Sequence, residues 1–183
     1  MTLNNVVKDI SDALVQIDKN DPPFKAYHPG VGPYGEPQLV KRIEYYLNQL
    51  KHFDGRCKAK RNPDLLIEDY WAIEFKIARP YGDNGKEAEN WTVNLLHPYP
   101  GNSSAIGDCL KLREWKGKER KAVLTISYEH SPAIISTEPL LKSFEAIAKS
   151  VVKIKLGNRI EQIRTGLKHP IHQQAKISAW EVI

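Results

Sequence analysis

The pattern of apolar and polar residues between positions 62 and 78 predicts a β-hairpin. Two short apolar runs, 65–67 and 71–78, flank a polar break of two acidic residues, which is typical of adjacent strands joined by a tight turn. Side chains alternate between the two faces of a strand, so the large apolar residues of the second run share one face, and Glu74 and Lys76 share the other. A carboxylate and an ammonium therefore project together from the face that the apolar side chains do not need.

Asp64 opens the first of these predicted strands and adds a second carboxylate to the same place. Pairing of the hairpin would bring Asp64 within a few ångströms of Glu74. Two acids and a lysine at one point make a divalent-metal site with a cationic neighbour. The alternative is an ordinary surface hairpin with a Glu74–Lys76 ion pair, which stabilises a fold by about 0.2 to 1 kcal/mol.

The rest of the chain shows the periodicities of both helices and strands. Apolar residues recur at intervals of three and four over four stretches, which predicts helices at 3–18, 37–51, 104–115 and 138–152. Two further apolar runs, 121–128 and 177–182, predict strands. The order of these elements predicts one α/β domain over residues 1–183, with a mixed central β-sheet flanked by helices. We expect the helix at 3–18 to pack on this core or on a second subunit.

Cations gather immediately before the hairpin, where four occur within six residues. Such a run is usually a solvated loop, but beside an acidic site it is also what a clamp for the phosphate backbone of DNA requires. The polar loop 79–90 follows the second strand of the hairpin and is placed to reach the same substrate. We therefore expect DNA contacts from Arg56, Lys58, Lys60, Arg61, Arg79, Asn84 and Lys86.

The composition is that of an ordinary globular protein with a basic balance. The 183 residues carry a formal net charge of +5, and the pI is about 9.1, which favours a polyanionic partner. Cys57 and Cys109 are far apart, so they indicate neither a disulfide framework nor a CxxC zinc site. His169 and His172 match no HNH-like or zinc-finger arrangement.

No secretion signal is present, and no apolar run approaches the ~18 residues that span a bilayer. We expect a cytoplasmic protein with no membrane segment.

Pro63-Asp64 and Glu74-Phe75-Lys76, separated by nine residues, resemble the motif of the PD-(D/E)XK nuclease superfamily. The resemblance implies a mixed-sheet fold in which the motif lies on a β-hairpin, after a helix that often supplies another acid. Here the predicted helix at 37–51 offers Glu36 at its start and Glu44 at the border of its apolar stripe. Either is a candidate for that acid. The alternatives are a favourable charge at the helix N-terminus for Glu36 and a solvated surface charge for Glu44.

The resemblance also implies hydrolysis of DNA phosphodiester bonds with Mg²⁺, for which Mn²⁺ can substitute. Asp64 and Glu74 are then the metal ligands, Lys76 positions or helps to deprotonate the attacking water, and Glu36 or Glu44 is the further acid. Carboxylates suit this role because Mg²⁺ prefers oxygen ligands and keeps several waters. The bound metal neutralises charge on the phosphate and lowers the pKa of its water.

A single domain of this kind is most similar to a type II restriction endonuclease, a homodimer that cuts a short symmetric site in double-stranded DNA. The same residues are compatible with three further functions. One is that of a DNA repair or junction-resolving nuclease, which recognises DNA shape. Another is that of a non-catalytic DNA-binding module on a nuclease-like fold, and the last is that of a structural protein with no nucleic-acid partner.

Overall fold

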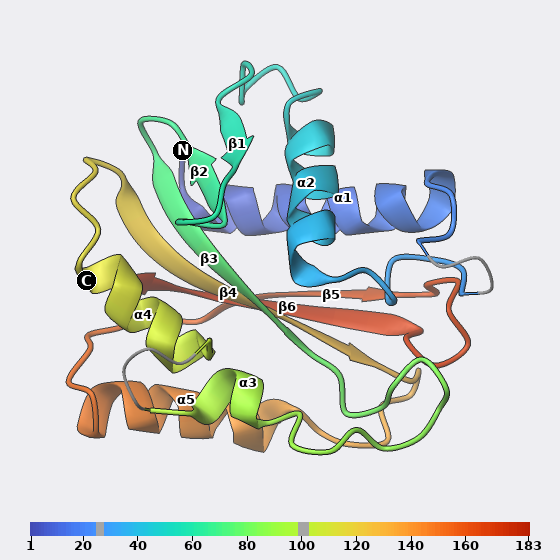
Figure 1. Ribbon diagram of the computed structural model, residues 1–183. Helices are drawn as coiled ribbons and strands as arrows, with labels where there is room; N and C mark the ends of the chain where they lie inside the picture. Colours follow the sequence, from blue (N-terminus) through green and yellow to red (C-terminus); the bar gives the residue numbers. More distant parts are fainter. Residues whose placement is uncertain (25–27, 99–102) are drawn as a thin grey trace.

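A six-stranded mixed β-sheet lies between two layers of helices (Figure 1). The computed structural model describes residues 1–24, 28–98 and 103–183. This architecture confirms the predicted α/β fold with a mixed central sheet flanked by helices. Among the described residues, no helix is both long enough and apolar enough to cross a membrane.

The sheet has the order β1-β2-β3-β4-β6-β5, and among the described strands β3 and β4 are the one parallel pair. Its strands are β1 (Cys57–Ala59), β2 (Leu65–Ile67), β3 (Trp71–Ala78), β4 (Arg120–Glu129), β5 (Ile160–Thr165) and β6 (Gln174–Val182). β2 and β3 pair antiparallel, which confirms the predicted hairpin. Parallel pairing of β3 and β4 needs a crossover connection, and this connection carries two helices.

Two helices cover one face of the sheet and three cover the other (Figure 1). They are α1 (Leu3–Asn20) and α2 (Glu36–Leu47) on the first face, and α3 (Val93–Leu96), α4 (Ala105–Arg113) and α5 (Glu138–Ser150) on the second. The apolar stripe of α1 is buried in the core of the first face. This helix was expected to pack either on the core or on a second subunit, and it packs on the core. Side-chain oxygens cap two of these helices: that of Thr2 accepts from Asn5 N, and that of Ser104 accepts from Gly107 N.

Both faces of β3 are buried, contrary to the expectation of a core face and a free face. The large apolar residues of β3 pack against α1 and α2, as expected. Ala72 and Ala78 belong to a second core, formed with α3, α4 and α5. Glu74 and Lys76 therefore lie in a covered recess, with small alanines on either side. The alternation along β3 was predicted correctly, but the helices that cover its second face come from distant parts of the chain.

Two strands were not predicted. β1 lies within the basic run that was interpreted as a loop, and it pairs with β2 at one edge of the sheet. β5 forms the other edge, and its residues alternate between half-buried and exposed positions. β1 is short and β5 is partly exposed to solvent. Neither strand therefore has the apolar run by which a buried strand is recognised in a sequence.

Candidate active site

Asp64 enters the site where the two strands of the hairpin separate. The ladder between β2 and β3 begins at Leu65↔Ile73, and Asp64 stands one residue before it. Its Oδ2 accepts a hydrogen bond of 2.8 Å from the backbone N–H of Phe75, so the carboxylate replaces the strand partner that this N–H lacks. The contact places Asp64 against β3 beside Glu74, and Phe75 itself is buried behind them.

Lys76 joins this point to two helices. Its Nζ is 3.0 Å from Glu36 Oε1, at the start of α2, and 3.1 Å from Asp108 Oδ2, on α4. Burial alone would lower the pKa of Lys76, but the carboxylates of Asp108 and Glu36 outweigh that effect and raise it. The ammonium is therefore charged and held between elements from both sides of the sheet.

Glu74 is the most strongly perturbed acid of the group. It is 2% exposed, and within the described structure its Oε1 has no hydrogen-bond partner. Burial first, and the adjacent Asp64 carboxylate second, raise the pKa of Glu74 to about 9. At neutral pH Glu74 is therefore protonated. A divalent cation fits this arrangement because it would bind the orphaned oxygen and neutralise both carboxylates.

The raised pKa of Glu74 makes the stability of the cation-free protein depend on pH. In the unfolded chain Glu74 ionises near 4.5, whereas in the folded chain it keeps its proton up to about pH 9. Between these values the folded state binds more protons, so we expect the free energy of unfolding to fall as pH rises. The slope for this one group is at most about 1.4 kcal/mol per pH unit.

Urea unfolding in EDTA at pH values from 5 to 8.5 would measure this dependence. The Glu74→Gln variant is the control, because its neutral amide keeps the size of the side chain and cannot ionise. We expect its stability to vary less with pH than that of the wild type over the same range. Equal slopes for the two proteins would show that Glu74 ionises normally in the fold.

Of the two acids proposed from the helix before the hairpin, the structure brings only Glu36 to the site. Glu44 lies two turns further along α2, near β1. There its charge is the second cause, after burial, that raises the pKa of Cys57 to about 12. Eight residues of helix correspond to about 12 Å along its axis, so the two acids cannot serve the same point.

The basic run divides into two pairs of different surroundings. Lys58 forms an ion pair with Glu68, and Arg56 lies 3.6 Å from the carboxylate of Asp54, so both have acidic neighbours away from the site. Lys60 and Arg61 instead line a surface pocket of about 530 Å³ that also contains Asp64 and, from α2, Lys41. Lys41 was not predicted, because it is distant in sequence from the other cations.

Arg79 is half-buried and supports a loop, and its expected contact with DNA stays a prediction. Its guanidinium donates to the backbone carbonyls of Gly32 and Tyr34, and burial lowers its pKa. These bonds fix the segment that leads directly into Glu36. Asn84 uses its side-chain oxygen to accept from the backbone N–H of Lys86. Among the described residues, no hydrogen bond or ion pair joins Arg79 or Asn84 to the carboxylates of the site.

Asp108 and Lys111 of α4 belong to the site and were missed from the sequence. The side chain of Asp108 has no exposed surface, and its Oδ1 is 2.6 Å from Lys111 Nζ. An acid and a lysine three residues apart are neighbours on a helix, but this spacing is common. Only the packing of α4 against β3 shows that the pair faces Lys76.

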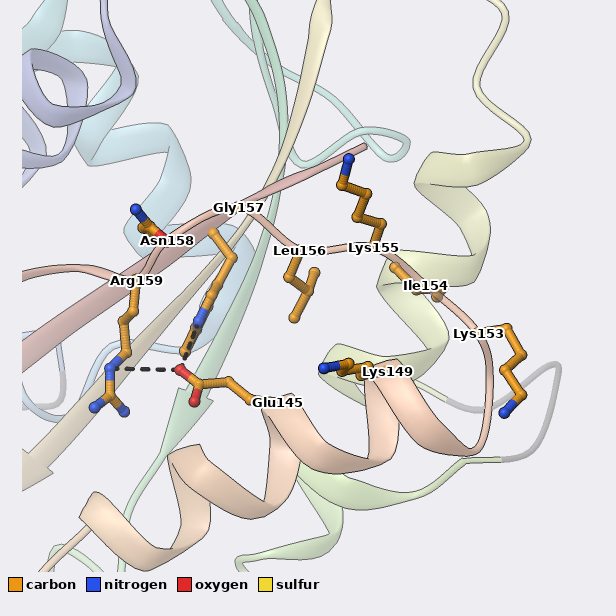
Figure 2. Close-up of a pocket in the computed structure, with 10 residues that line it drawn as sticks. Glu145, Lys149, Lys153, Ile154, Lys155, Leu156, Gly157, Asn158 and Arg159 are labelled. Carbon is orange, nitrogen blue, oxygen red and sulfur yellow. Dashed lines mark hydrogen bonds and ion pairs between the residues drawn. The ribbon is translucent and has the colours of Figure 1, made fainter.

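A pocket of about 690 Å³ lies elsewhere, between α5 and residues 153–159 (Figure 2). Its one carboxylate, Glu145, accepts a hydrogen bond from Trp180 Nε1 and lies 3.5 Å from Arg159 Nε. Lys153 and Lys155 point away from one another (Figure 2). The pocket therefore has no pair of acids and no convergent set of cations, so its size does not mark a reaction centre.

His169, His172 and Asp83 form a second group of metal-binding side chains, with ligand atoms within 4.8 Å of one another. The protons of the two rings are already assigned by their contacts. His169 Nδ1 accepts from two backbone N–H groups, those of residues 171 and 172, so its proton is on Nε2 and blocks coordination there. His172 Nε2 is 2.9 Å from the carbonyl of Tyr81, and its Nδ1 lies so close to Gly32 that a Cβ there would be 2.6 Å away. His172 Nδ1 also lies 3.9 Å from Asp83 Oδ1, and among the described residues it has no hydrogen-bond partner, so the group could hold a metal ion through this nitrogen and the carboxylate.

Comparisons with known proteins give no relative from which a role could be transferred. No protein-family model matches the chain, no curated protein matches it, and no solved structure matches its fold.

Proposed function

We propose that this protein is a Mg²⁺-dependent endodeoxyribonuclease, of the type II restriction kind, that hydrolyses phosphodiester bonds in double-stranded DNA as a homodimer. The proposal rests on one observation above all. Asp64, Glu74 and Lys76 of the hairpin meet Glu36 of the preceding helix in a single recess, which is the arrangement that the resemblance to PD-(D/E)XK nucleases implies.

The chemistry assigned to each residue follows from its position. Asp64 and Glu74 would hold the cation, which supplies Lewis-acid stabilisation of the phosphate when bound. Lys76 is charged and held by Glu36 and Asp108, so it is placed to orient the attacking water and to stabilise negative charge that develops at the phosphorus. Glu36 keeps Lys76 in position from the side of α2. Covering of the recess by helices lowers the local dielectric and strengthens each of these interactions.

The DNA backbone has a basic approach to the recess. Lys60 and Arg61 share the pocket beside Asp64 with Lys41, and a phosphate neighbouring the scissile one would lie within their field. The resulting affinity should depend strongly on salt, because each phosphate contact releases a condensed counterion.

Incubation of the purified chain with supercoiled plasmid DNA, in Mg²⁺ and in EDTA, tests the proposal. We expect discrete fragments in Mg²⁺ or Mn²⁺ and intact plasmid in EDTA. Cutting of branched or damaged DNA alone would instead indicate a repair or junction-resolving nuclease. Salt-sensitive binding without cutting, in any divalent cation, would indicate a DNA-binding module. A protein that neither binds nor cuts DNA would contradict the proposal as a whole.

A further inference from the structure

A second lysine, Lys111 on α4, lies beside the buried pair of Asp108 and Lys76. Lys111 Nζ is 2.6 Å from Asp108 Oδ1, and the other oxygen of the same carboxylate, Oδ2, is 3.1 Å from Lys76 Nζ. The side chain of Asp108 has no exposed surface, whereas that of Lys111 is 47% exposed. One buried carboxylate therefore holds a buried lysine on one side and a half-exposed lysine on the other.

The position of α4 directs Lys111 toward the carboxylates as well as toward solvent. The helix begins at the cap formed by Ser104, whose hydroxyl also donates to the carbonyl of His97. It packs against β3, so its Asp108 side faces the strand that carries Glu74. Lys111 is near enough to Glu74 for its charge to oppose the rise in the pKa of that acid.

Lys111 contributes little to the stability of the fold. Asp108 already has Lys76 as a buried partner. An exposed lysine added to that pair contributes little stability, typically below about 1 kcal/mol. Its long side chain is 47% exposed, so it stays free to exchange Asp108 for another anion.

We propose that Lys111 is a second catalytic cation, which contacts the scissile phosphate across from the metal-binding carboxylates. This inference rests on the proposed nuclease function. In the hydrolysis, the oxygen of water forms a new bond to phosphorus, and the bond from phosphorus to the leaving sugar oxygen breaks, its electron pair remaining on that oxygen. The proton that water loses passes to solvent. Lys111 stays protonated throughout and stabilises the negative charge that grows on the phosphoryl oxygens.

The test compares single-turnover cleavage by the wild type, Lys111→Met, Lys111→Arg and Lys149→Met. Lys149 is an exposed lysine on α5, outside the site, and controls for the loss of one surface charge. Removal of a single stabilising group from a reacting centre costs about 10²–10³ in rate when the group is buried. For the half-exposed Lys111 we expect a loss of roughly 10- to 100-fold in Lys111→Met, partial recovery in Lys111→Arg, and no change in Lys149→Met.

Binding and folding are measured on the same proteins, with Ca²⁺ in place of Mg²⁺ for DNA affinity. We expect Lys111→Met to bind DNA within about threefold of the wild type and to melt at a similar temperature, because Asp108 keeps its buried partner Lys76 and the half-exposed Lys111 contributes little stability. A wild-type rate in Lys111→Met would overturn the role of Lys111, and so would an equal loss in the Met and Arg variants. Failure of the wild type itself to cleave would instead overturn the nuclease function.

Discussion

The Asp64→Ala and Glu74→Gln variants are expected to lose DNA cleavage by about a thousandfold or more. Both side chains meet at the point where the hairpin opens, and they are the acids proposed to hold the cation. A bound metal contributes several kcal/mol to the stabilisation of charge at a phosphoryl group. Loss of about 4 kcal/mol corresponds to a thousandfold in rate. Cleavage of a plasmid in Mg²⁺, followed as a time course, measures the effect.

The same two variants are expected to bind DNA at least as tightly as the wild type. Asp64→Ala removes a carboxylate beside the proposed position of the phosphate, so repulsion of the backbone decreases. Glu74→Gln replaces a protonated acid by a neutral amide, so it leaves that repulsion unchanged. Binding without cleavage therefore distinguishes a lost metal ligand from a protein that has failed to fold. Glu44→Gln is the matched control, because it changes an acid on α2 that lies near Cys57 and not in the recess. If Asp64→Ala or Glu74→Gln cuts at the wild-type rate, the assignment of the metal ligands is wrong.

The hairpin was predictable from the sequence because its determinants are local. Alternation over eight residues decides which side chains of β3 share a face, and the tight turn brings the acid at the start of β2 opposite β3. The pairing observed between Leu65 and Ile73 follows from the same short segment. Local patterns therefore sufficed to place Asp64, Glu74 and Lys76 together.

Which of the two acids, Glu36 or Glu44, reaches the site depends on distant parts of the chain, so the sequence left both as candidates. Both lie on one helix, and only the crossing of α2 over the sheet decides which of its ends approaches β3. The structure brings the N-terminal end to Lys76. The bonds from Arg79 to the loop before α2 contribute to this choice, and they join segments more than 40 residues apart in sequence.

The covering of Glu74 was the main feature that sequence reasoning could not supply. Glu74 and Lys76 were expected on a free face because their own strand gives no sign of what packs on them. α4 supplies that cover from beyond position 100. The same packing introduces Asp108, whose role depends on a partner in β3 and on no motif of its own. Burial then raises the pKa of Glu74, an effect that composition and spacing do not contain.

The Lys76→Met variant is expected to reduce cleavage by about 10²–10³ while leaving metal binding nearly intact. Methionine fills a similar volume but lacks the charge that Glu36 and Asp108 hold in place. Without an ammonium the attacking water loses its orienting partner, yet Asp64 and Glu74 are unchanged. Calorimetric titration with Mn²⁺ measures binding, and single-turnover kinetics measure the chemical step.

Lys76→Arg refines this prediction, because arginine keeps the charge but replaces a compact ammonium by a planar fork. Lys76 is 8% exposed, so the recess has little room for the larger group, and we expect the Arg variant to recover only a small part of the rate. A Lys76→Met protein that binds no metal would show that Lys76 organises the carboxylates. One that cleaves normally would remove Lys76 from the reaction. Loss of cleavage with retained metal binding is the result that assigns Lys76 to the chemical step, because metal coordination and charge stabilisation are then carried by different side chains.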